Sequence, residues 1–164
     1  MLLIGACVSY AQQGGTEPAN PTDSATCKFD DGGSVRTEYS SVRVNGRTIF
    51  GGTLPYGKVW RTGDHKATTF VSDTDLSIGG EDVPAGSYTL FTIPAAEKWT
   101  LIISKKTDGP GIPYPEGEDL LRVDMHVAKT PSLVENLMIT YDRSGGKCIL
   151  RIRRENPEAW GKRG

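Results

Sequence analysis

The chain has 164 residues, of which 37% are hydrophobic and 24% are charged, and its formal net charge is −1 at pH 7. This length is typical of one domain with one hydrophobic core. The near-neutral charge argues against binding to DNA or RNA, which requires clustered positive charge. No stretch of the sequence approaches the ~20 consecutive apolar residues of a membrane-spanning helix. We therefore expect a single domain with no transmembrane segment and no nucleic-acid partner.

Residues 1–11 are typical of an export signal peptide. They are apolar and uncharged, and Ser9 and Ala11 place small residues at the −3 and −1 positions of a cleavage site before Gln12. The basic residues that normally open a signal peptide are missing, which leaves a start upstream of Met1 open. An alternative interpretation takes "IGAC" as a lipoprotein box, with Cys7 carrying a lipid anchor. Both interpretations predict a periplasmic or secreted protein.

The cysteine content agrees with export. When Cys7 is removed with the signal peptide, Cys27 and Cys148 remain, which is an even pair for an oxidising compartment. Both residues lie in strand-like runs, near opposite ends of the domain sequence. We predict a disulfide between them.

Most of the remaining sequence consists of short strand-like runs separated by turn residues. Residues 12–25 are rich in Gly, Pro, Ser, Thr and Asn, and we expect a flexible linker there. Asp31-Gly32 and Gly145-Gly146 are typical turns of β-hairpins. No run of eleven or more residues shows helical periodicity. The strand-like segments are, in chain order, 26–42, 67–80, 86–106, 119–130 and 134–153.

These segments predict an all-β fold. We expect an antiparallel β-sandwich of about eight or nine strands, with a jelly-roll-like or related Greek-key topology. The domain is expected to cover residues 26–154. Basic residues outnumber acidic ones by five to two over residues 151–164, and residues 155–164 are expected to form a solvated basic tail.

One long irregular segment, residues 43–67, holds the candidate site residues. Long ordered loops in compact domains are often functional. This segment combines aromatic, cationic and titratable side chains within a short run, and three interpretations of it are open. The candidates are Tyr56, Trp60, Arg61, Asp64 and His65.

In the first interpretation, the segment is a structural corner. Trp60 buries its ring in the core, and Arg61 points the other way along extended backbone and anchors the loop through polar contacts. In the second, residues 51–66 bind a small molecule or a carbohydrate, because aromatic rings stack on sugars and Arg binds carboxylate or phosphate. In the third, Asp64 and His65 form the general acid–base pair of an enzyme of unrecognised class.

The third interpretation has little support from the rest of the sequence. Adjacent side chains such as Asp64 and His65 diverge on extended backbone, and no nucleophile motif or metal-ligand spacing accompanies them. We predict no catalytic residue, no metal and no cofactor. We expect a non-catalytic domain whose partner is a small molecule, a glycan or another protein.

Several blocks of the sequence resemble a known family. The blocks "PYGKVWRTG", "VPAGSYTLFTIP" and "KWTLIISKKT", and the later "DLLRVDMHV" and "VENLMITYD", resemble the exported bacterial domain of unknown function 2911 (DUF2911). The resemblance spans about residues 27–151 and implies an exported β-rich domain without an established activity. Relatives usually carry Ala-Asn-Glu where this chain has Asp64-His65-Lys66, so the family does not imply a histidine there. Relatives also continue as a strand after Leu150, which leaves open whether this chain ends in a native strand or an altered tail.

Overall fold

The computed structural model describes residues 21–161, and the regular elements of this range are all strands. Seven strands form one antiparallel sheet in the order β1-β2-β3-β6-β7-β8-β9, and β4 pairs only with β5. The strands are β1 Thr22–Lys28, β2 Ser34–Ser40, β3 Thr68–Ser72, β4 Leu76–Ile78, β5 Glu81–Val83, β6 Gly86–Ile93, β7 Lys98–Ser104, β8 Asp119–Ser144 and β9 Lys147–Gly161.

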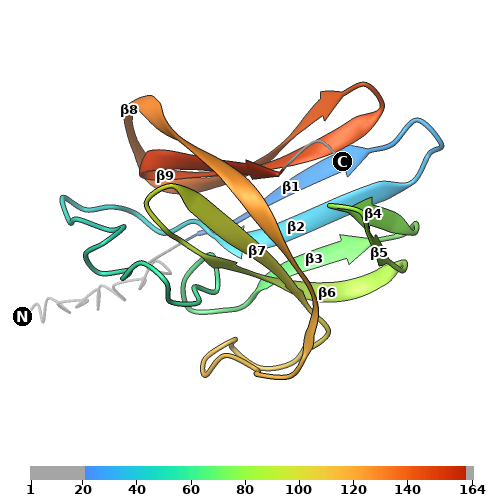
Figure 1. Ribbon diagram of the computed structural model, residues 1–164, viewed down its shortest axis with the longest axis horizontal. Helices are drawn as coiled ribbons and strands as arrows, with labels where there is room; N and C mark the ends of the chain where they lie inside the picture. Colours follow the sequence, from blue (N-terminus) through green and yellow to red (C-terminus); the bar gives the residue numbers. More distant parts are fainter. Residues whose placement is uncertain (1–20, 162–164) are drawn as a thin grey trace, which may run out of the picture.

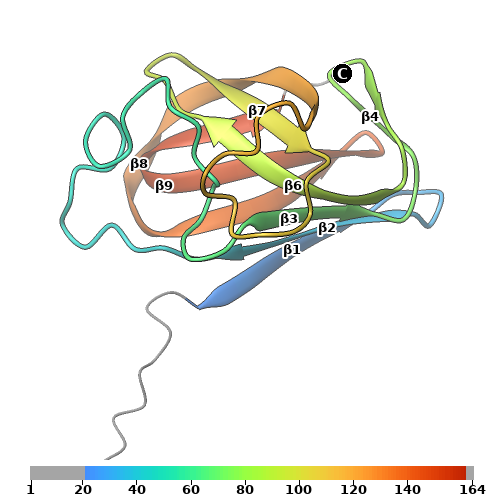
Figure 2. The same ribbon diagram turned by 90° about the horizontal axis from the view of Figure 1, so that it is seen from below.

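The seven-stranded sheet curves round into a nearly closed barrel (Figures 1 and 2). Its two edge strands are β1 and β9, and the predicted disulfide between Cys27 and Cys148 joins them. The segment that follows β2 makes a second link across the barrel, to β8. There the N–H of Val44 donates to the carbonyl of Glu135 in β8, at 2.8 Å.

The predicted antiparallel all-β fold is confirmed, but the predicted sandwich with jelly-roll or Greek-key topology is not. Apart from the β4–β5 excursion, the strand order follows the chain order, which is a meander. The difference arises in β8, which continues for 26 residues through register shifts near Val134. Such irregularities bend a strand without ending it, so one sheet curls on itself where a sandwich would need two.

Local turn chemistry accounts for two of the hairpins. Gly32, at φ +89°, follows Asp31 in the turn between β1 and β2, and the N–H of Phe29 donates to the carbonyl of Gly33 at 2.7 Å. Gly145 and Gly146 both have positive φ and join β8 to β9, as two-residue hairpin turns require. Both turns lie where the sequence predicts them.

The core fills the inside of the barrel. In the register of β6 and β7, Leu90 lies opposite Ile103 and Thr92 lies opposite Leu101, and all four are buried. The other face of β6 is covered as well, because the ring of Phe91 packs edge-on against that of Tyr114, with centroids 5.0 Å apart. The largest fully buried side chains include Trp99, Met125, Leu137, Ile139 and Ile152.

Two predicted boundaries change. Strand β1 begins at Thr22, inside the predicted linker of residues 12–25, and β9 runs to Gly161 where a tail was expected from residue 155. The end of β9 pairs with β8, and Ala159 is fully buried; backbone pairing therefore outweighs the basic composition. The predicted signal peptide, including Cys7, lies outside the described residues. Within residues 21–161 no helix is long and apolar enough to cross a membrane.

Candidate functional site

Residues 41–67 form a long segment that extends beyond one end of the barrel (Figure 1). Backbone hydrogen bonds tie it to the sheet: the N–H of Trp60 donates to the carbonyl of Thr92 at 2.7 Å, and the reverse bond is 3.0 Å. The carboxylate of Glu155 in β9 accepts the N–H of Ile49 at 2.7 Å and that of Phe50 at 3.3 Å. The segment is thus an ordered cover, held from two sides.

Trp60 is part of the core, as the structural-corner interpretation expects. Its side chain is 6% exposed. Its ring lies edge-on to Phe50 and to Trp99, with centroids 5.7 and 6.2 Å apart. The indole N–H donates to the carbonyl of Gly63 at 3.3 Å. Such a ring stabilises the fold, and its faces are not available for stacking on a sugar.

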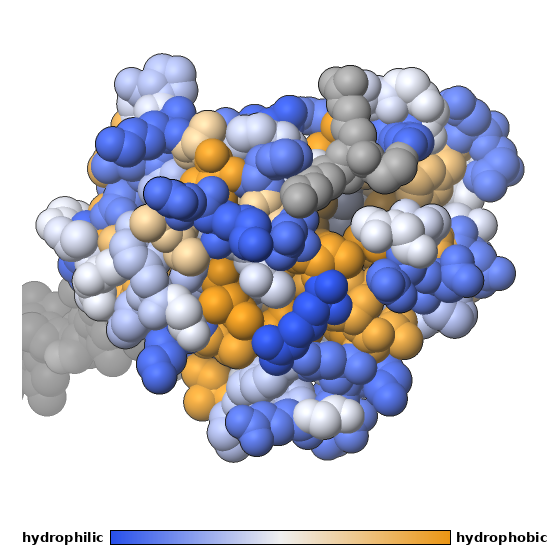
Figure 3. Space-filling model, viewed as in Figure 1, coloured by the Kyte–Doolittle hydropathy of each residue, from blue (hydrophilic) through white to orange (hydrophobic). Residues whose placement is uncertain are grey.

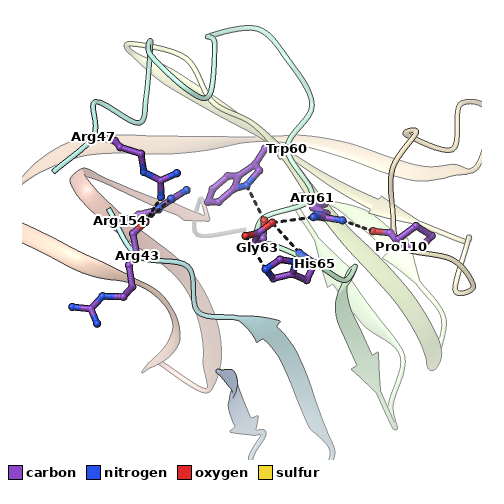
Figure 4. Close-up of polar contacts among 9 residues, drawn as sticks. Arg43, Arg47, Trp60, Arg61, Gly63, His65, Pro110 and Arg154 are labelled. Atoms are coloured by element: carbon purple, nitrogen blue, oxygen red, sulfur yellow. Dashed lines mark hydrogen bonds and ion pairs between the residues drawn. The ribbon is translucent and has the colours of Figure 1, made fainter. Parts of the chain in front are cut away.

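Arg61 and His65 lie close together (Figure 4), and both contact the carboxylate of Asp64. Arg61 donates to Oδ1 of Asp64 and to the carbonyl of Pro110, both at 3.1 Å. Nε2 of His65, whose side chain is 62% exposed, lies 3.4 Å from Oδ2 of Asp64. Arg61 therefore anchors the segment to a neighbouring loop, through one bond from each of its two terminal nitrogens.

Electrostatics keep Asp64 ionised. Partial burial raises the pKa of this carboxyl, but the backbone N–H of His65 and the charges of His65 and Arg61 outweigh it, so the pKa lies below its usual value. Tyr56 is not part of this group. Its ring packs over Gly51, and the residue is 49% exposed. The five predicted residues thus divide into one core ring, one exposed ring and one polar group of three.

Arg154 is a residue of this end that sequence reasoning missed. It lies in β9 and is only 4% exposed, with its guanidinium over the ring of Trp60, 5.7 Å from the centroid. Nη2 donates to the carbonyl of Arg43 at 3.1 Å, whereas the buried Nε has no hydrogen-bond partner among the described residues. Arg47 donates to the same carbonyl at 2.7 Å.

The pKa of Arg154 is lowered to about 10, first by burial and then by the nearby charge of Arg47. The group still carries its charge at neutral pH. The sequence contains a signal for its burial, because Leu150, Ile152 and Arg154 alternate along β9 and share its inner face.

The opposite end of the barrel, which we call its mouth, holds a pocket of about 900 Å³. It lies between the β4–β5 hairpin and the turn that joins β8 to β9. Figure 3 shows apolar surface between polar side chains on the face that Figure 1 views. Tyr141 also lines the pocket. Its hydroxyl is hydrogen-bonded to the hydroxyl of Thr37 at 2.7 Å. The apolar lining includes Phe70, Leu76, Ile78, Leu101, Val123 and Leu150.

The pocket combines features of a binding site for a small molecule. It combines apolar side chains with polar groups, and charged residues such as Asp75, Glu81 and Lys147 also line it. Burial raises the pKa of the Tyr141 phenol, so it stays protonated and can only exchange hydrogen bonds. Within residues 21–161 no three His, Cys, Asp or Glu side chains are grouped to hold a metal ion.

The sequence matches the family described as "Protein of unknown function (DUF2911)" over residues 20–159. The chain belongs to the DUF2911 family. The matched range runs from before β1 to near the end of β9 and so includes both ends of the barrel. No curated protein and no solved structure matches the chain. The family assignment leaves the activity of this DUF2911 domain undefined.

Proposed function

We propose that this domain acts outside the cytoplasm as a non-catalytic binding module, which holds a small, mainly apolar molecule in the pocket at the mouth of the barrel. The observation that carries the proposal is the pocket itself. A space of about 900 Å³ lined by Phe70, Leu76 and Ile78 is of the size and chemistry in which proteins hold small ligands. Water against the apolar part of this wall gains few hydrogen bonds, so an apolar group that displaces it there is favoured.

Two features support action outside the cytoplasm. The disulfide between Cys27 and Cys148 suits an oxidising compartment. Residues 1–11 have the composition of an export signal. Cleavage by signal peptidase is the form of processing that we propose, with lipidation of Cys7 as the alternative.

Residues 51–66, the part of the long segment expected to bind a ligand, fit better as a structural cover than as the ligand site. Its Trp60 ring is packed on other rings, and Arg61 is bonded to Asp64 and Pro110. Catalysis by Asp64 and His65 is supported only by their 3.4 Å contact. Turnover of a substrate that is lost in Asp64→Asn would favour that alternative over ours.

Binding can be measured with N-phenyl-1-naphthylamine, a neutral dye whose fluorescence rises in apolar sites. We expect saturable binding to the wild-type protein and its loss in Ile78→Trp, which fills the pocket. Val71→Trp is the matched control, because Val71 is exposed on β3. Circular dichroism and a melting curve check that each variant folds. Equal dye binding in Ile78→Trp, or none in the wild type, would refute the proposal.

A further inference from the structure

Two arginines converge at the end of the barrel opposite the pocket. The guanidinium groups of Arg47 and Arg154 both donate to the carbonyl oxygen of Arg43, at 2.7 and 3.1 Å (Figure 4). They come from distant parts of the chain, Arg47 from the long segment and Arg154 from β9. Two like charges held on one oxygen repel each other, so their convergence needs a compensating charge.

The carboxylates nearby are used elsewhere. Among the described residues, no carboxylate oxygen lies within 4.0 Å of the guanidinium nitrogens of Arg47 or Arg154. Glu155 accepts the backbone N–H groups of Ile49 and Phe50. Glu135 accepts the N–H of Asn45 at 2.9 Å. No carboxylate of residues 21–161 therefore bonds to either guanidinium, although Glu155, Asp64 and Glu135 lie near enough to favour the charge of Arg154.

Arg154 has a buried N–H donor that no acceptor of residues 21–161 satisfies. The residue is 4% exposed, and its Nε–H is buried without an acceptor among the described residues. A buried unpaired charge is costly, and arginine cannot lower that cost by losing its proton at neutral pH. Arg47, by contrast, is exposed to solvent.

We propose that Arg47 and Arg154 form a binding site for a small oxyanion, such as a carboxylate, phosphate or sulfate group. Guanidinium groups bind planar or tetrahedral oxyanions through paired N–H donors. The anion supplies a bonded counter-ion and links the long segment to β9. The site is separate from the pocket at the mouth, and the proposal does not depend on a ligand there.

Melting curves with sodium phosphate, sulfate or acetate test the site, with sodium chloride at matched ionic strength as the reference. We expect one or more of the oxyanions to raise the melting temperature saturably, by about 5–10 °C at roughly a hundred times the dissociation constant. The response to each anion identifies the class that the site prefers. No rise above the chloride reference with any of the three would overturn the proposal.

Variants assign the effect to the two arginines. Arg154→Met and Arg47→Met should abolish the response, and Lys58→Met, which removes an exposed cation of the same segment, should keep it. Arg154→Met should melt no lower than the wild type in chloride, because it removes an unpaired buried charge. If that variant does not fold, Arg47→Met decides alone, because its residue lies at the surface. An undiminished response in Arg47→Met would contradict the assignment.

Discussion

Cys27 and Cys148 join the first and last strands of the sheet, which no backbone ladder among the described residues connects. Cys148 also lines the pocket at the mouth of the barrel. The bond links positions 121 residues apart in sequence, so on the chain-entropy model it restricts the unfolded chain strongly. It thus fixes both the seam of the barrel and one wall of the pocket.

Removing this bond should weaken both stability and binding. We expect Cys27→Ala combined with Cys148→Ala to lower the free energy of unfolding by about 2–5 kcal/mol and to weaken dye binding in the pocket. Urea denaturation of the variant and of the wild type, each with and without reductant, measures the first effect. The variant should not respond to reductant. A wild-type protein that is equally stable with and without reductant would contradict this role of the bond.

Trp60 and Tyr56 should respond very differently to truncation. Trp60→Ala leaves a cavity among Phe50 and Trp99, and we expect it to lower the free energy of unfolding by about 3–5 kcal/mol. Tyr56→Ala is the control, because its ring is half exposed, and its cost should stay below about 1 kcal/mol. Denaturant titrations compare the two variants. Similar costs for both would mean that Trp60 does not pack as the structure has it.

The Arg61–Asp64 contact should contribute a pH-dependent part of the stability. The pKa of Asp64 is lowered from 3.8 in the folded state, so its contribution is fully present above that value and is lost as the pH falls below it. The side chain is 38% exposed, which keeps the contribution under about 1 kcal/mol.

We therefore expect Asp64→Asn to be slightly less stable than the wild type at pH 7, with the difference disappearing at acid pH. Urea titrations between neutral pH and about pH 2 measure this difference in the free energy of unfolding, over the pH range in which unfolding is reversible. Asp82→Asn, at an exposed position in β5, serves as the control. A difference that grows as the pH falls would have the wrong sign for this contact.

The sequence predicts the local elements well and their assembly less well. Turn residues such as Asp31-Gly32 and Gly145-Gly146 specify hairpins through backbone conformation, which depends only on neighbouring residues. Whether hairpins form a sandwich or one curled sheet depends on how β8 bends and on which edges meet. These contacts join residues far apart in sequence, and no local pattern encodes them.

The same division applies to the candidate sites. The burial of Trp60 follows from its apolar ring, and the disulfide follows from the even number of cysteines in the domain. The burial of Arg154 is not expected from its residue type, because charged residues are seldom buried, although its alternation with Ile152 places it inside. The pocket at the mouth is formed by turns from separate parts of the chain, so its walls become visible only in three dimensions.

The β4–β5 hairpin is an insertion that the barrel does not need for its hydrogen bonding. Strands β3 and β6 precede and follow this hairpin in the sequence, and they pair directly with each other. Strands β4 and β5 pair only with each other. Leu76 and Ile78 nevertheless form part of the pocket wall. Changes in the length or composition of this hairpin would therefore alter what the pocket accepts while leaving the ladders of the sheet intact. The scaffold and its selectivity can diverge at different rates in evolution, and grafting other hairpins between Ser72 and Gly86 offers a route to new specificities on the same barrel.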